Sequence, residues 1–186
     1  ETETERVTNR ATAGRELHAA QAAAQRVAQK LLLNSSDLGA PVLLASLHVD
    51  SCALQCLATN FGAVRAAAIS NVHLVYCVPP LAETSLTPAS AAALDGNLAV
   101  VRRGAVPVSV KAQHVQDAGA VGLVLINSDD HAWLPFVKTE EDQAAASKTN
   151  IPIVIVPKSA ETALSAGAPA TLLIETSVPD PQPGLS

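Results

Sequence analysis

A glycine turn at Arg103-Gly104 raises the question of phosphate chemistry. It follows a short apolar run and precedes a stretch with helical spacing, which is where phosphate-binding enzymes place their loops. A P-loop needs a second glycine five residues after the first, followed by Lys and then Ser or Thr. Counted from Gly104, those places hold Ser109 and Val110, and Lys111 comes one residue late. The dinucleotide fingerprint fails as well, so we expect Gly104 to serve a tight turn.

A second group of residues has the types that ligate metal ions. His48, Asp50 and Cys52 would share one face of an extended segment, because side chains alternate along a strand. A structural zinc site needs four ligands, and no second ligand pair stands out in the sequence. A polar turn between a strand and a loop is therefore the favoured interpretation, and we expect no metal and no cofactor.

The loop over residues 128–142 is the candidate interaction site, through Asp129, Asp130, His131, Trp133 and Phe136. Trp133 and Phe136 are two of only four aromatic residues in the chain. Aromatic side chains exposed in loops are common binding anchors. A chain with so few aromatic residues is also expected to use them in its core, so both interpretations stay open. Adjacent carboxylates serve solvation more often than cation binding, which predicts no metal here.

Composition and motifs exclude several classes of function. The chain has no G-x-S-x-G elbow, no H-E-x-x-H and no C-x-x-C, and its five histidines do not cluster, so we expect a non-enzyme. A net charge of -5 without a basic block argues against nucleic-acid binding. No apolar run reaches the roughly 18 to 20 residues of a membrane span.

Apolar patterning predicts the elements that must position these residues. Short aliphatic runs between Gly, Pro, Asn or Ser predict strands at residues 42–47, 63–69, 72–78, 98–101, 121–126, 151–156 and 170–175. Helical spacing predicts one helix from Val108 to Ala118, ended by Gly119, and a shorter one from Ser159 to Ala166. Strands that alternate with helices in the second half favour a mixed α/β fold of the α+β or α/β kind.

The first 33 residues carry a single apolar stripe at helical spacing, made of Leu17, Ala20, Ala24, Val27 and Leu31. It predicts an amphipathic helix that either joins a partner as a coiled coil or packs on its own domain. About two heptads rich in alanine are short for a coiled coil, which favours packing. The chain thus divides into a helical segment, residues 1–36, a domain, residues 37–178, and a Pro-rich tail, residues 179–186.

Several short motifs in one order resemble the protease-associated domain family. They read NFG at 60–62, VYCVP at 75–79, NLAVVRRG at 97–104, QDAGA at 116–120, GLVLIN at 122–127 and NIPIVI at 150–155. The resemblance covers about residues 42–175. It implies a mixed β-sheet or open barrel flanked by two short helices, with Arg103, Gly104 and Gly119 as structural turn residues and Lys111 near a helix start.

The resemblance also implies a role. Protease-associated domains are non-catalytic parts of peptidases, sorting receptors and ubiquitin ligases, and are thought to bind protein or peptide segments. We therefore expect an interaction module of a larger protein. The alternatives are a substrate-access or regulatory domain of a peptidase whose catalytic residues lie elsewhere, and a structural or self-associating unit acting through residues 1–33.

Cysteine usage bears on the compartment. An odd, sparse set of three cysteines, at positions 52, 56 and 77, argues against a disulfide framework without excluding one bridge. Secretory members of the family usually carry Cys and Phe after Arg-Gly, where this chain has Val106 and Val108. The missing Cys favours a cytosolic branch of the family, or a domain held by its core alone, and leaves a secretory or endomembrane route open.

Overall fold

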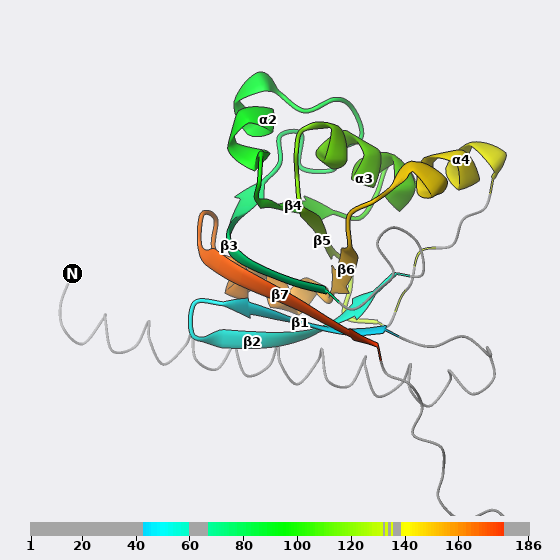
Figure 1. The fold of residues 1–186 in the computed structure, drawn as a ribbon. Coiled ribbons are helices and arrows are strands. Elements are labelled where there is room, and N and C mark those ends of the chain that lie inside the picture. Colours follow the sequence, from blue (N-terminus) through cyan, green and yellow to red (C-terminus); the bar gives the residue numbers. More distant parts are fainter. Residues whose placement is uncertain (1–42, 60–66, 132, 134, 136–138, 177–186) are drawn as a thin grey trace, which may run out of the picture.

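The computed structural model describes residues 43–59, 67–131, 133, 135 and 139–176. Its strands are β1 (Leu43–Val49), β2 (Cys52–Ala58), β3 (Ala67–Tyr76), β4 (Leu98–Arg102), β5 (Gly122–Ile126), β6 (Ile153–Val156) and β7 (Pro169–Thr176). Its helices are α2 (Pro88–Leu94), α3 (Val108–Asp117), α4 (Glu140–Lys148) and the short 3-10 helix η1 (Lys158–Ala163). Figure 1 shows α2, α3 and α4 together on one side of the strands.

The strands form a closed barrel in the order β1-β2-β6-β5-β4-β3-β7. β3, β4, β5 and β6 run parallel, whereas β1, β2 and β7 join them through antiparallel pairs. In the parallel part Arg102 lies beside Ile126, and Ile126 lies beside Val156. The carboxyl ends of these strands therefore meet at one end of the barrel.

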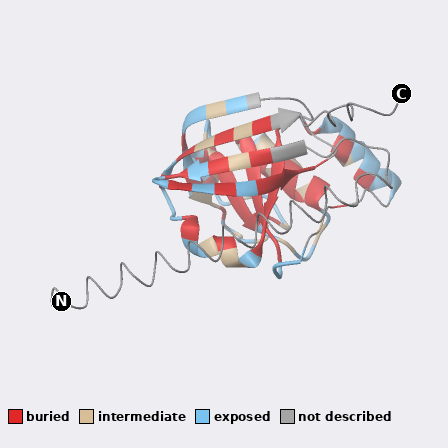
Figure 2. Ribbon diagram, turned by 90° about the horizontal axis from the view of Figure 1, so that it is seen from below, coloured by how far each residue is buried: buried red, intermediate tan, exposed pale blue. Residues whose placement is uncertain are grey.

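Two hydrophobic cores follow from the alternation of side chains along the strands. In β5, Val124 and Ile126 belong to the core inside the barrel, whereas Leu123 and Leu125 belong to a second core with α2 and α3 residues. All five residues of β5 are buried, because a parallel strand covered by helices has no solvent face. Figure 2 shows strands that are buried along their length, as β5 and β6 are, and others in which buried and exposed residues alternate, as in β1 and β2.

The second half of the fold agrees well with the pattern-based expectations. The predicted strands over 98–101, 121–126, 151–156 and 170–175 are confirmed as β4, β5, β6 and β7, and the predicted helix over 108–118 is confirmed as α3. The helix expected from Ser159 to Ala166 is the 3-10 helix η1, which ends at Ala163. Of the expected mixed β-sheet or open barrel, the mixed sheet is confirmed, but the barrel is closed and not open, since β2 pairs with β6.

The first half differs more from the expectations. The described part of the run at 63–69 and most of the run at 72–78 belong to a single strand, β3 (Ala67–Tyr76), with a register shift between Ile69 and Val72. Asn71, inside that shift, has a φ of 59°, which explains why the pattern breaks without ending the strand.

Three elements were not expected from the pattern. The polar turn expected after His48 is formed by Asp50 and Ser51, and the strand β2 follows it at once, its inward positions alternating with exposed Ala53 and Gln55. The helices α2 and α4 are present in addition to the two short helices that were expected. Thr87 caps α2 by accepting from Ser90 N, and Thr139 caps α4 by accepting from Asp142 N.

The expected amphipathic helix of residues 1–36 and the tail of residues 179–186 lie outside the described residues. Among the helices that the structure describes, none combines the length and apolarity needed to cross a membrane.

Candidate interaction site

The carboxyl ends of the parallel strands bring together the residues on which the sequence analysis concentrated. β4 runs into Arg103 and Gly104, β5 into Asn127, and β6 into Pro157 and Lys158. The ladder continues one residue past β4 and β5, because Arg103 N donates to Ile126 O at 2.9 Å. In α/β folds, ligands bind at this end of the strands, where loops of different strands meet.

Asn127 organises the loop that leaves β5. Its side chain is buried, with 3% of the residue exposed. Its Oδ1 accepts from Arg103 Nη1 at 2.9 Å and from Ser128 N at 2.8 Å, and its Nδ2 donates to His131 O at 2.9 Å. Because both ends of the amide are satisfied, Asn127 fixes the turn after β5 and the direction of the Arg103 side chain together.

Trp133 lies under the Arg103 guanidinium, whose Cζ is 3.7 Å from the ring centroid. The ring is half-buried and packs against the core between the barrel and the helices. One part of the ring thus serves the core, while Arg103 covers another part, a contact worth about 0.5–1 kcal/mol at exposed sites. Phe136, the other aromatic residue of the loop, lies outside the described residues.

The acidic residues of the loop are exposed and bonded to backbone amides. Asp129 Oδ1 accepts from His131 N at 2.9 Å, and Asp130 Oδ1 accepts from Ser159 N at 2.8 Å. Lys158 N donates to Asp129 O at 3.1 Å, which ties the loop to η1. The His131 side chain is 86% exposed. These contacts define a stable turn, and within the described part of the chain no three His, Cys, Asp or Glu side chains are placed to hold a metal ion.

The turn after β4 separates two neighbouring arginines. Arg102 Nε donates to Glu161 Oε1 at 3.0 Å and forms an ion pair with η1, whereas Arg103 points to Asn127 and Trp133. Gly104 has a φ of 129° and Ala105 a φ of 67°. The positive φ at Gly104 is a conformation that glycine adopts easily, and it turns the chain towards α3.

The helix α3 carries a charged residue that the apolar pattern did not single out. Lys111 is fully buried, and its Nζ donates to Leu81 O. Burial lowers the pKa of Lys111, and the carboxylate of Glu83 acts in the opposite direction. The ring of His114, one turn later, has Nδ1 2.8 Å from Ala82 O. The position of Lys111 three residues after Val108, on the apolar face, was the sequence signal that this lysine is buried.

The other residues considered as ligands or nucleophiles do not form a site. His48 is exposed on β1, Asp50 lies in the turn with a φ of 53°, and Cys52 is buried, so the three do not share one face. All three cysteines are buried. Burial raises the pKa of Cys56 to about 12 and that of Cys77 to about 11, so these two thiols stay protonated at neutral pH.

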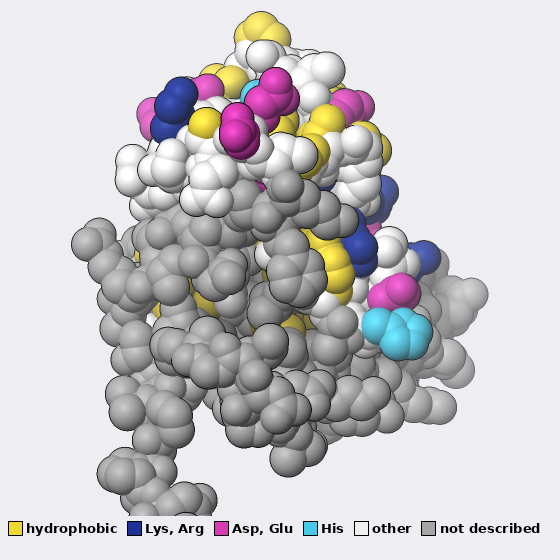
Figure 3. Space-filling view, turned by 90° about the vertical axis from the view of Figure 1, so that its right-hand side faces the viewer, with side chains coloured by type: hydrophobic (Ala, Val, Ile, Leu, Met, Phe, Trp, Pro, Cys, Tyr) yellow, Lys and Arg dark blue, Asp and Glu magenta, His cyan; other side chains and the backbone are white. Residues whose placement is uncertain are grey.

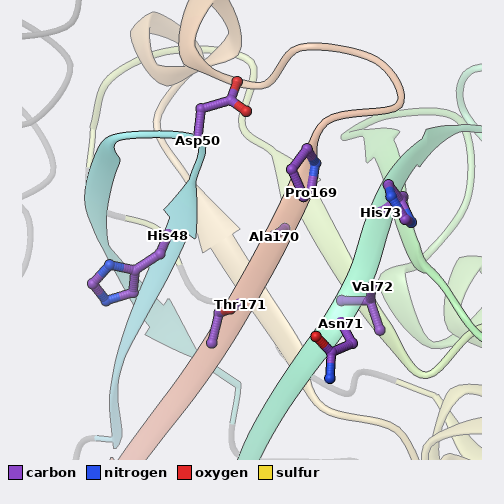
Figure 4. A pocket seen from close by; sticks show the side chains of 8 residues that line it. All are labelled: His48, Asp50, Asn71, Val72, His73, Pro169, Ala170 and Thr171. Carbon is purple, nitrogen blue, oxygen red and sulfur yellow. The ribbon is translucent and has the colours of Figure 1, made fainter.

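A depression of about 410 Å³ lies at another place on the barrel surface, over β1, β7 and β3. Its polar side chains include His48, Asp50, Asn71 and His73. Figure 4 shows His48 and His73 on either side of β7, with the four side chains directed away from one another. They do not converge on a common point that a small ligand would fill.

The surface charge of the molecule is mixed. Figure 3 shows one face on which acidic side chains gather over the helical end and basic, acidic and histidine side chains alternate at one flank. A surface of this kind favours local contacts over long-range attraction of a strongly charged partner.

Comparison with known proteins identifies the fold. The PA domain family model matches residues 70–165, more than half of the 186 residues. Comparison with curated proteins gives no match. The zinc aminopeptidase BSAP of Bacillus subtilis is similar in structure, with a TM-score of 0.53 and 16% identity over 88% of this chain and 43% of the aminopeptidase chain.

A psychrophilic subtilisin-like protease of Pseudoalteromonas sp. AS-11 is similar to the same degree, with a TM-score of 0.53 and 16% identity over 73% of this chain and 34% of the protease. This chain therefore spans less than half the length of the structures it resembles, and at this identity they support the fold alone. The family motifs, the closed mixed barrel and the match over residues 70–165 agree, and the chain belongs to the protease-associated (PA) domain family.

Proposed function

We propose that this PA domain is a non-catalytic module that binds a protein or peptide segment on behalf of a larger protein. The binding surface is the loop end of the parallel strands, formed by Arg103, Asp129, Asp130, His131 and Trp133. The observation that carries the proposal is the half-buried Trp133 ring held under the Arg103 guanidinium at 3.7 Å. Trp and Arg are enriched among the residues that dominate binding energies at protein interfaces.

Rigidity supports this role. Asn127 fixes both the loop and Arg103, and the two loop carboxylates are bonded to backbone amides. A surface that is ordered before binding loses less conformational entropy when a partner arrives. The non-catalytic part of the proposal is supported by the thiols, since Cys56 and Cys77 are buried with raised pKa values and are poor nucleophiles.

The experiment uses the sole tryptophan of the chain as its probe. Because Trp133 is the only Trp, the intrinsic fluorescence of the chain reports on this loop alone. Short peptides selected for binding from a displayed random library should change the Trp133 emission on titration. The Trp133→Ala variant should bind them at least about tenfold more weakly, measured with labelled peptides by fluorescence polarisation.

The matched control is His73→Ala, an exposed side chain on the β3 part of the barrel, remote in sequence from the loop. It should bind the selected peptides as the unmodified chain does. Selected peptides that bind Trp133→Ala with unchanged affinity would contradict the proposal.

A second function is favoured by the likeness of the fold to chains described as a zinc aminopeptidase and a subtilisin-like protease. In that case the domain controls the access of substrates to a peptidase site outside this chain. Trp133→Ala in the whole host protein should then lower kcat/KM for a folded protein substrate while leaving kcat/KM for a dipeptide analogue unchanged. Equal effects on both substrates would argue against access control.

A further inference from the structure

We infer that the group recognised by this surface is a carboxylate, held by the guanidinium of Arg103. The inference rests on the proposed interaction function and specifies the chemistry of the partner. It starts from a contrast between two consecutive arginines at the end of β4. Arg102 has its carboxylate, since it pairs with Glu161. Arg103 has none among the described residues.

The hydrogen-bonding capacity of Arg103 is largely unused. A guanidinium carries five N–H donors, and towards the described residues the side chain of Arg103 uses one of them, for Asn127 Oδ1 at 2.9 Å. Within the described ranges no Asp or Glu oxygen lies within 4.0 Å of its nitrogens. An arginine cation with unused donors in a planar fork matches a carboxylate, which accepts two parallel hydrogen bonds.

Arg103 is also oriented in advance. The guanidinium stacks on Trp133 at 3.7 Å, and its hydrogen bond to the buried Asn127 adds a second constraint on its orientation. An arginine held in this way has lost most of its rotamer freedom before binding, so an incoming carboxylate does not have to order it. A freely moving surface arginine would gain much less from the same contact.

The neighbouring acids decide how recognition must work. Asp129 and Asp130 are exposed in the same loop and would repel a carboxylate at long range. Each is already bonded to a backbone amide, of His131 and Ser159 respectively, and neither pairs with Arg103. The attraction must therefore come from the direct two-point contact with the guanidinium. A lysine at this position would carry the charge without the fork and should not replace Arg103.

Two sources supply a carboxylate on a peptide: an Asp or Glu side chain, and the free C-terminus. The test uses the whole 186-residue chain and hexapeptide pools as probes. Each pool fixes Asp, Glu, Asn or Gln at one position and randomises the others, and every pool is made with a free and with an amidated C-terminus. Binding is followed by Trp133 fluorescence and by polarisation of labelled peptides.

Pools that contain the recognised carboxylate should bind about tenfold to a hundredfold more tightly than their amide counterparts. The preference should disappear in Arg103→Gln. It should be strongly reduced in Arg103→Lys, which keeps the charge and so tests the need for the two parallel hydrogen bonds of the guanidinium. Arg102→Gln is the matched control and should keep the full preference, because Arg102 already pairs with Glu161. If the C-terminus is the source, every pool with a free C-terminus should bind more tightly than its amidated counterpart. If a side chain is the source, the Asp and Glu pools should bind more tightly than the Asn and Gln pools with either C-terminus.

Circular dichroism and the Trp133 emission maximum establish that the variants are folded, and Arg103→Lys provides a second reading if Arg103→Gln is not. Equal binding of the Asp and Glu pools and the Asn and Gln pools, together with equal binding of the free and the amidated pools, would overturn the carboxylate inference alone and leave the interaction module standing. Retention of the preference in Arg103→Gln would also overturn it. If no pool binds the chain at all, the inference fails together with the proposed function.

Discussion

Gly119, between the end of α3 and β5, gives the sharpest test of the packing that positions the loop end of the barrel. Its φ is 92°, its N–H donates to Gln116 O at 2.9 Å, and its carbonyl accepts from Gly96 N at 2.9 Å. A methyl group added here would lie 2.4 Å from Asp95 Oδ1 and 3.2 Å from Asp95 Cα. Gly119→Ala is therefore destabilised in two ways: by the strain of a side chain at a positive φ, and by a steric clash with Asp95, the residue that ends α2.

A substitution at Gly96 measures the backbone strain without the steric clash. Its φ is 76°, and an added methyl group would meet nothing within 4 Å. Gly96→Ala should therefore show the backbone cost alone, about 1–2 kcal/mol. The gain from a stiffer unfolded chain is about the same for both substitutions and cancels in their difference.

The collision adds to this cost at Gly119. Forcing an extra methyl group into a packed site costs about 1–3 kcal/mol, because the neighbours must move. Gly119→Ala should thus lower the free energy of unfolding by about 2–5 kcal/mol, and by about 1–3 kcal/mol more than Gly96→Ala. The 3.2 Å approach to the Asp95 backbone makes the upper half of this range the expected one.

Urea unfolding followed by circular dichroism measures both variants, provided that the m-value stays constant. Replacing Asp95 by Ala in the Gly119→Ala background removes the Oδ1 collision and should recover part of the loss, which a double-mutant cycle quantifies. The packing argument is refuted if Gly119→Ala and Gly96→Ala differ by less than about 0.5 kcal/mol, the usual limit of additivity.

Two further measurements probe the core and the helix that follows the interaction loop. Burial raises the pKa of Cys56 from 9.0 to about 12, so the folded state holds its proton where the unfolded thiol ionises, and stability should fall as pH rises from 9 towards 12. In Cys56→Ala this fall, measured by urea unfolding at a series of pH values, should be less steep, and an equal slope would contradict the burial of the thiol. Thr139 caps α4 through Asp142 N at 3.0 Å, so Thr139→Ala should cost about 1 kcal/mol in urea unfolding. Replacing the exposed Thr162 by Ala should lower the free energy of unfolding clearly less. Equal losses in the two variants would contradict a stabilising role of the Thr139 cap.

The sequence predicted the parallel half of the barrel because burial on both faces leaves a clear mark. β4, β5 and β6 appear as continuous apolar runs, since each has the barrel core on one face and helices on the other. The helix α3 stood out by its apolar spacing and by Gly119 at its end.

The antiparallel half was harder because its outer face carries small and polar residues. In β2 the inward Cys52 was assigned to a polar turn, although cysteine is among the most buried residue types. The helix α4 has only alanines as apolar residues, so its best signal was the Thr139 cap followed by three acidic residues. Such a cap predicts where a helix begins but gives no indication of what the helix packs against.

The candidate site depended on contacts that are distant in sequence. The loop and the strand end were each identified from the residues, but the stacking of Arg103 on Trp133 requires the strand register that places β4 beside β5. From the sequence alone, Trp133 could be either an exposed binding anchor or a part of the core. A half-buried ring that packs on the core and carries a guanidinium combines features of both.

The surroundings of the two arginines could not be predicted from the sequence pattern, because they depend on the fold. Neighbouring residues at the end of a strand point to opposite faces, so Arg102 and Arg103 were bound to reach different surroundings. Which of them is neutralised depends on Glu161, 59 residues further along the chain, and the 3-10 helix η1 brings that carboxylate to Arg102. Arg103 is left with Asn127 and Trp133, two partners that hold its guanidinium in place without cancelling its charge. A cation held in this way keeps donors for a carboxylate from a partner, which is why its binding preference is the decisive measurement.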